Sequence, residues 1–186
     1  VEAFAWEKNS LSLVFRTAFN GVEQLFEYSL PKDLSQLAPN QDITQLTKEK
    51  TCTGAFIPTG KYIIAERYDF NRPNELVAYD LKRKTIRPLT DVNGPAMQSI
   101  APSPVQARWV TTTDGRQMLV WMVFPPHFDP AKKYPALLFC GGGPQSPLTP
   151  DYSFRWNFQL MAAKGYVNGS GGRIMPTANI PRSFVT

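Results

Sequence analysis

The sequence predicts a mostly β protein with a partial α/β segment. Three observations lead to this prediction: repeated strand–turn–strand patterns in the first half, a short motif that occurs twice, and an apolar strand followed by glycines and a helical pattern. The chain has 186 residues, of which 42% are hydrophobic and 12% aromatic, so it can bury a packed core. Its 17 prolines are typical of a loop-rich protein rather than a helical bundle.

Charge and residue usage exclude several classes of function. The formal net charge is +5, but the basic residues are scattered and the densest group, Lys82–Lys84, falls in a predicted turn, so we expect no nucleic-acid partner. The longest apolar run, Met118–Phe124, is too short to cross a bilayer. Cys52 and Cys140 lack metal-ligand spacing and are read as buried free thiols. We expect no metal site and no cofactor. The N-terminus has no signal-peptide pattern and is read as mature or as an internal cut, which leaves the compartment open.

Residues 1–92 read as short strands separated by turns. Alternating segments flank Asn20-Gly21, a strong hairpin signal, and a second pair flanks the predicted turn Asn71–Asn74. The paired segments are Ser12–Thr17 with Glu23–Leu30, and Lys61–Tyr68 with Glu75–Asp80. Carboxylates on these strands and turns are expected to lie on solvated faces.

A weak internal repeat adds to this picture. Ile43–Thr47 (ITQLT) matches Ile86–Thr90 (IRPLT). A period of about 40–50 residues with roughly four strands per unit is the signature of β-propeller blades. We therefore expect 1–92 to be blades of a propeller, with two unrelated antiparallel sheets as the alternative. Two blades cannot close a ring.

The second half begins with a connector. Residues 93–106 contain Pro and Gly and are predicted to be a linker. A hairpin follows, formed by Ala107–Thr113 and Gln117–Phe124 around Asp114-Gly115. After a Pro-rich loop, Pro135–Cys140 is an apolar run expected to be a strand buried on both faces, as in parallel sheets.

This strand runs directly into Gly141-Gly142-Gly143-Pro144. In hydrolases built on a parallel sheet, a glycine-rich loop after an early strand supplies one backbone N–H of the oxyanion hole. Gly141 and Gly142 are therefore the candidate oxyanion-binding residues, with a simple tight turn as the alternative.

A helix is predicted after the glycines. Phe154, Phe158, Met161 and Ala162 recur at helical spacing, Asp151 or Ser153 can cap the start, and Lys164-Gly165 marks the end. Tyr166-Val167 reads as the first step of another strand, which would complete a βαβ unit and a parallel pair. Residues 168–186 are rich in Gly, Pro, Ser and Asn, and we expect an irregular tail, with a truncated or frame-shifted end as one origin and a genuine surface tail as another.

At this point the residues resemble a known family. Tyr134–Phe139, Gly142–Ser146, Phe154–Phe158 and Ala162–Val167 look like the prolyl oligopeptidase family of serine peptidases, in particular its dipeptidyl-aminopeptidase and acylaminoacyl-peptidase branches. The resemblance covers residues 1–167 and stops after Val167. It implies that 1–92 are the last propeller blades and that 107–167 are the first strands and helix of an α/β-hydrolase domain.

The resemblance also implies chemistry, with two departures. The family commonly has a tyrosine before its Gly-Gly-Pro turn, where Gly141 stands here. Losing one oxyanion donor costs about 2.7–4 kcal/mol of transition-state stabilisation. The Gly-x-Ser-x-Gly elbow and the later Asp and His are expected after Val167, and the sequence shows none of them. Ser170 lacks the elbow pattern, and the single histidine, His127, precedes the glycines, so neither is assigned a catalytic role.

The sequence therefore predicts a C-terminally truncated serine peptidase of short peptides that is inactive by itself. Arg155 and Trp156, beside the glycine loop, are candidate substrate-proximal residues, with packing as the alternative. The competing hypothesis is a non-catalytic β-sheet module that binds peptides or proteins through open edges. We expect the chain alone to self-associate. Relatives of this type are often exported, including to the periplasm.

Overall fold

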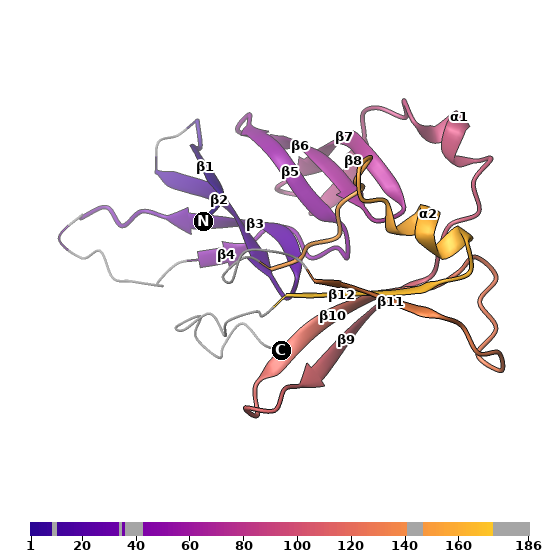
Figure 1. The fold of residues 1–186 in the computed structure, drawn as a ribbon. Coiled ribbons are helices and arrows are strands. Elements are labelled where there is room, and N and C mark those ends of the chain that lie inside the picture. The colour runs from indigo at the N-terminus through magenta and orange to yellow at the C-terminus, as the bar shows by residue number, and fades with distance from the viewer. Residues whose placement is uncertain (9–10, 34, 36–42, 141–146, 173–186) are drawn as a thin grey trace.

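Three four-stranded sheets follow one another along the chain (Figure 1). The computed structural model describes residues 1–8, 11–33, 35, 43–140 and 147–172. The first sheet comprises β1 (Ala3–Trp6), β2 (Ser12–Phe19), β3 (Val22–Ser29) and β4 (Ile43–Gln45). The second comprises β5 (Cys52–Pro58), β6 (Tyr62–Asp69), β7 (Arg72–Asp80) and β8 (Thr85–Pro88). Both are antiparallel meanders in chain order, which confirms the prediction of a mostly β chain built on antiparallel sheets.

The β2–β3 hairpin turns where the sequence predicts. Asn20 and Gly21 have φ angles of 50° and 80°, the left-handed conformation that a tight two-residue hairpin requires at both positions. Gly21 also meets the third sheet closely, because a Cβ built on it would lie 2.0 Å from Leu119 Cδ2. Glycine is therefore needed at this position both for its conformation and for its size.

The β6–β7 hairpin turns earlier than predicted. The turn is Phe70-Asn71, and the strand resumes at Arg72, so the predicted turn Asn71–Asn74 is wrong at its last three residues. The register of β6 and β7 shifts between Arg67 and Asp69, which places Pro73 opposite an irregularity. A bulge is one of the few places where a strand tolerates a proline.

The third sheet has the order β11-β12-β10-β9 and mixes the two pairing directions. Its strands are β9 (Val105–Thr111), β10 (Gln117–Val123), β11 (Ala136–Cys140) and β12 (Val167–Gly172). The β9–β10 hairpin passes through Gly115, whose φ is 75°, as predicted. A short helix, α1 (Gly94–Met97), interrupts the connector that precedes this sheet.

β12 corrects the prediction of an irregular tail from residue 168. The strand continues to Gly172, pairing in parallel with β11 and antiparallel with β10. The segment Asn168–Gly172 has weak intrinsic strand preference, but neighbours on both sides supply backbone hydrogen bonds, and this tertiary context decides its structure. The parallel β11–β12 pair agrees with the predicted βαβ unit. The remainder of the predicted tail, 173–186, lies outside the described residues.

The helix α2 (Phe158–Ala163) starts later than predicted. Asn157 caps it by accepting a hydrogen bond from Leu160 N at 3.1 Å, whereas the earlier Ser153 accepts from Trp156 N at 2.9 Å in a separate bend. Phe154, predicted on the helix face, precedes the helix and is 85% exposed. The predicted C-terminal end of the helix is confirmed, because Gly165 has a φ of 90° directly after the C-cap residue Lys164.

Two cores hold the sheets together. The first lies between the first and second sheets. The second core lies between the hairpin turns of those sheets, β10 and α2, and includes Phe70, Leu119, Trp121 and Phe158. The first core contains Val14, Leu25, Ile63, Ala65, Val77 and Tyr79.

β11 is not buried on both faces as predicted. Leu137 is 40% and Leu138 76% exposed. Among the described strands β11 lies at the edge of its sheet, and only the face with Phe139 packs against α2. An apolar run thus marks the strand but does not by itself decide what covers it.

Candidate functional site

The described residues on either side of the glycine run contact the second core. Gly141 and Gly142, the predicted oxyanion-binding residues, lie outside the described residues. On the N-terminal side, Phe139 packs edge-to-face against Phe158 of α2, with ring centroids 5.2 Å apart. On the C-terminal side, the Trp121 indole N–H donates to the Leu148 carbonyl at 3.0 Å. The run therefore lies between two segments that are each tied to the second core.

The predicted substrate-proximal residues lie just before α2. Trp156 is 49% exposed, and its ring lies 6.0 Å from that of Phe139 in a tilted arrangement. The exposed Arg155 places its guanidinium carbon 5.6 Å from the centre of the Trp156 ring, in a cation–π contact. The structure thus places Trp156 beside Phe139 of β11, with Arg155 over the Trp156 ring. Both retain an exposed surface, and both also make packing contacts.

Ser170 and His127, to which the sequence assigns no catalytic role, lie apart from each other in β12 and in the loop between β10 and β11. Ser170 is 2% exposed in the middle of β12, with Trp121 and Phe139 as its strand partners. A nucleophile at a strand-to-helix elbow must instead present its hydroxyl at the end of a strand. His127 is exposed in the loop between β10 and β11, with a φ of 58°.

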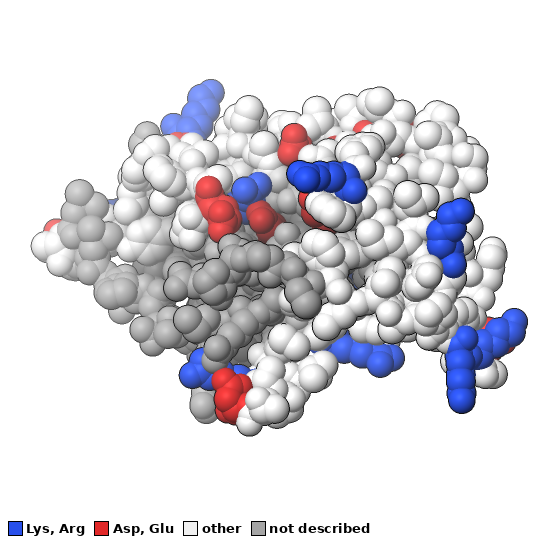
Figure 2. All heavy atoms as spheres, viewed as in Figure 1, with Lys and Arg blue, Asp and Glu red and all other residues white. Residues whose placement is uncertain are grey.

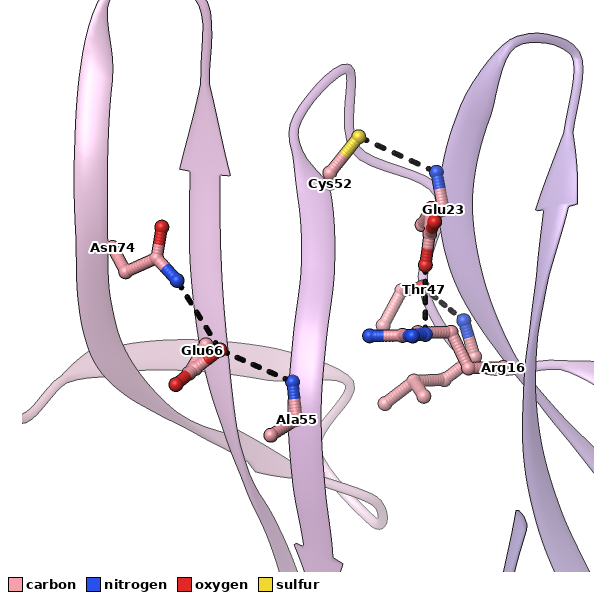
Figure 3. A network of polar contacts seen from close by, with 8 residues as sticks. Arg16, Glu23, Thr47, Cys52, Ala55, Glu66 and Asn74 are labelled. Carbon is pink, nitrogen blue, oxygen red and sulfur yellow. Dashed lines mark hydrogen bonds and ion pairs between the residues drawn. The ribbon is translucent and has the colours of Figure 1, made fainter. Parts of the chain in front are cut away.

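Where the first and second sheets meet, the structure reveals a polar junction that the sequence did not indicate. Arg16 of β2 pairs with Glu23 of β3 at 2.7 Å, and Glu23 N donates to Cys52 Sγ at 3.4 Å (Figure 3). Burial raises the pKa of Glu23. The positive charge of Arg16 lowers this pKa, and the negative charge of Asp151 raises it further. Glu23 was expected on a solvated face. Its partial burial follows from sheet packing, which strand alternation alone does not reveal.

Cys52 of this junction is a structural rather than a reactive cysteine. It is 0% exposed, and burial raises the pKa of its thiol to about 12. At neutral pH the thiol stays protonated, whereas the thiolate is the nucleophilic form. Cys52 therefore packs between the sheets as a protonated, buried thiol.

Two further strand carboxylates hold backbone groups in place. Glu66 of β6 accepts from Ala55 N and from Asn74 Nδ2, both at 3.2 Å, and so bridges β5 and β7 at an irregularity of β5 (Figure 3). Glu75 accepts from Asn93 N at 2.8 Å and from the Thr90 hydroxyl, and these bonds lower its pKa to about 2. Both act as structural acceptors.

Three further observations concern surface charge, metal ligands and helix length. On the face seen in Figure 2 acidic and basic side chains lie close to one another, and most of the described surface carries neither charge. In the part of the chain that the structure describes, no group of three or more His, Cys, Asp or Glu side chains could hold a metal ion. Within the same residues, none of the helices is both long and apolar enough to cross a membrane.

Comparison with known proteins gives both sequence relatives and structural neighbours. The chain is 33% identical over 167 residues to dipeptidyl-peptidase 5 of Porphyromonas gingivalis, a match that covers 90% of this chain and 23% of that protein. The acylaminoacyl peptidase of Pyrococcus horikoshii has a TM-score of 0.68 at 21% identity, over 88% of this chain and 23% of that one. Dipeptidyl peptidase 4 of P. gingivalis has a TM-score of 0.63 at 18% identity, over 90% and 23%.

These matches share one property. The chain spans about a quarter of the length of the proteins that it matches. No family model matches the chain. The two structural neighbours support the fold, and the sequence relative, at higher identity, supports kinship with a peptidase.

Proposed function

The chain is related to peptidases of the prolyl oligopeptidase family, and on that premise we propose that it forms part of a serine peptidase that cleaves short peptides, of the dipeptidyl- or acylaminoacyl-peptidase type. The observation that carries this proposal is the 33% identity to dipeptidyl-peptidase 5 over 167 residues. The match extends through 90% of the chain.

Within this proposal each part of the chain has a structural role. Residues 1–92 are the last blades of a propeller, 93–106 a linker, and 107–167, extended here to Gly172, the start of an α/β-hydrolase domain. Two four-stranded meanders in chain order support the blade assignment. The parallel β11–β12 pair joined through α2 supports the hydrolase assignment.

The glycine run supplies the chemistry that this chain contributes. Backbone N–H groups of Gly141 and Gly142 hold the oxyanion that forms when a serine attacks the peptide carbonyl. Arg155 and Trp156 line the approach of the substrate, the guanidinium as a hydrogen-bond donor to a peptide carbonyl and the indole as an apolar wall. Their exposed surfaces beside the end of β11 support this role.

The catalytic serine, aspartate and histidine are not among the residues of this chain in our proposal, so the chain alone is inactive. We expect no fluorophosphonate labelling and no hydrolysis of dipeptidyl chromogenic substrates by the 186-residue chain. Dipeptidyl-peptidase 5 of P. gingivalis, assayed in parallel, is the positive control. Serine labelling together with turnover by the chain alone would show that it carries its own nucleophile.

A chimera tests the peptidase function itself. The matched 167-residue segment of dipeptidyl-peptidase 5 is replaced by the corresponding part of this chain. We expect the chimera to release dipeptides, and we expect Gly141→Tyr to raise its kcat by about 10²–10³-fold, because the tyrosine restores an oxyanion donor. A folded chimera that releases no dipeptides, with or without Gly141→Tyr, would favour the non-catalytic binding module.

A further inference from the structure

Phe70 belongs to the second sheet but is part of the core of the third. It lies in the β6–β7 turn, is 5% exposed, and inserts between two rings. Its ring centroid lies 5.9 Å from that of Trp121 and 5.7 Å from that of Phe158, both edge-to-face. Such pairs add about 0.5–1.5 kcal/mol each beyond the area they bury. One side chain of the meander thus supports both β10 and α2.

The two rings that Phe70 contacts are those that hold the backbone on either side of the glycine run. Phe158 packs on Phe139, the residue before the last one of β11. Trp121 donates its indole N–H to the carbonyl of Leu148, which follows the run. Loss of the Phe70 ring would therefore loosen both supports at once.

Hydrogen bonds fix the turn that carries Phe70. The Gln159 side chain of α2 donates to the Phe70 carbonyl at 3.1 Å and to Asn71 Oδ1. Ser103 N donates to Asn71 Oδ1 at 3.1 Å and to Gln159 Oε1 at 3.0 Å, and Asn71 Nδ2 donates to the Ser103 carbonyl at 3.1 Å. Ser103 is 2% exposed. A shift of the turn would leave these groups unpaired away from water, which is costly.

We propose that Phe70 is a positioning residue that the second sheet contributes to the third: through Phe158 and Trp121 it holds in place the end of β11 and the segment at Leu148. Its consequence for catalysis rests on the proposed peptidase function. If Gly141 and Gly142 bind the oxyanion, loss of the Phe70 ring should slow the chemical step, because a displaced N–H donor stabilises the transition state less.

Hydrogen exchange measured by mass spectrometry on the 186-residue chain tests the positioning directly. We expect Phe70→Ala to accelerate amide exchange at least tenfold in 136–140 and 147–160, with the β1–β3 amides unchanged. Phe4→Ala, a change at a ring that is 65% exposed on β1, is the matched control and should leave both segments unchanged. Unchanged exchange in both segments, or equal acceleration throughout the chain, would overturn the proposal.

A second variant keeps the test decisive if Phe70→Ala does not fold. Trp121→Phe retains a ring beside Phe70 but removes the donor to Leu148, so exchange should rise in 147–157 and not in 136–140. Trp109→Phe, at an indole that is 51% exposed on β9, is its control and should change neither segment. Unchanged exchange in 147–157 in Trp121→Phe would refute the proposed hold on that side of the run.

The chimera separates this inference from the proposed function. There, Phe70→Ala should lower kcat at least tenfold and change KM less than twofold. An inactive chimera would contradict the peptidase function, while the exchange experiment would still decide the positioning role. An active chimera in which Phe70→Ala changes kcat less than twofold would refute the catalytic consequence alone.

Discussion

Replacing Gly21 by alanine tests how the first sheet docks on the third. The residue has a φ of 80°, where an L side chain costs roughly 1–2 kcal/mol. The new Cβ would also lie 2.0 Å from Leu119 Cδ2. Leu119 is 3% exposed and packed in the second core, so it cannot move aside freely, and overpacking of this kind typically costs about 1–3 kcal/mol. We therefore expect Gly21→Ala to lower the free energy of unfolding by about 2–5 kcal/mol.

Gly115→Ala is the matched control for this change. Gly115 has a φ of 75°, but a Cβ at this position would meet no heavy atom within 4 Å, so only the conformational cost of about 1–2 kcal/mol applies. Urea unfolding followed by circular dichroism gives both free energies. The difference between the two variants, about 1–3 kcal/mol, measures the contact with Leu119.

A double variant shows whether the contact is the cause. Leu119→Ala alone should cost about 2–5 kcal/mol through the cavity that it leaves. In Gly21→Ala with Leu119→Ala the added methyl group enters that space, so the double variant should lose less than the sum of the two single changes. Equal losses for Gly21→Ala and Gly115→Ala, together with additive behaviour of the pair, would refute the docking of the turn on Leu119.

Three further predictions concern stability and reactivity. Glu75 has a folded-state pKa of about 2, below its ordinary value of 4.5, so its ionised form stabilises the fold above pH 4.5 and this stabilisation is lost as the pH falls through about 2. Glu75→Gln should therefore destabilise the chain at pH 7, and unfolding curves of variant and parent should converge near pH 2; a pH-independent difference would contradict this. In a Cys140→Ser variant, Cys52 is the remaining thiol, and it should react with a thiol reagent at pH 8 only as fast as the chain unfolds. The reason is that Cys52 is buried and its pKa is raised to about 12. Immediate labelling of the folded chain would argue against this burial. Ile63→Ala, at a position 0% exposed between the first two sheets, should cost about 2–5 kcal/mol in urea unfolding, whereas Ile57→Ala, at a position 67% exposed, should change stability by at most about 0.5 kcal/mol.

The sequence alone was sufficient for the features that depend on local conformation. Asn20-Gly21 and the turn at Gly115 were located correctly, because few residues adopt a positive φ without cost and their identity marks the turn. The end of α2 was correct for the same reason, since Gly165 takes a φ of 90° after the C-cap. The assignment of the glycine run as the oxyanion-binding site stays a prediction, because Gly141 and Gly142 lie outside the described residues.

Features that depend on distant partners were decided only by tertiary structure. β12 forms because β10 and β11 offer hydrogen bonds on both sides, and Glu23 is half-buried because Arg16 and the second sheet lie against it. Phe70 gave no local signal of importance, yet it joins two segments that are far away along the chain. Local patterns report the conformation of a few residues, whereas burial and support of a site arise where separate segments meet, and only the folded chain brings them together.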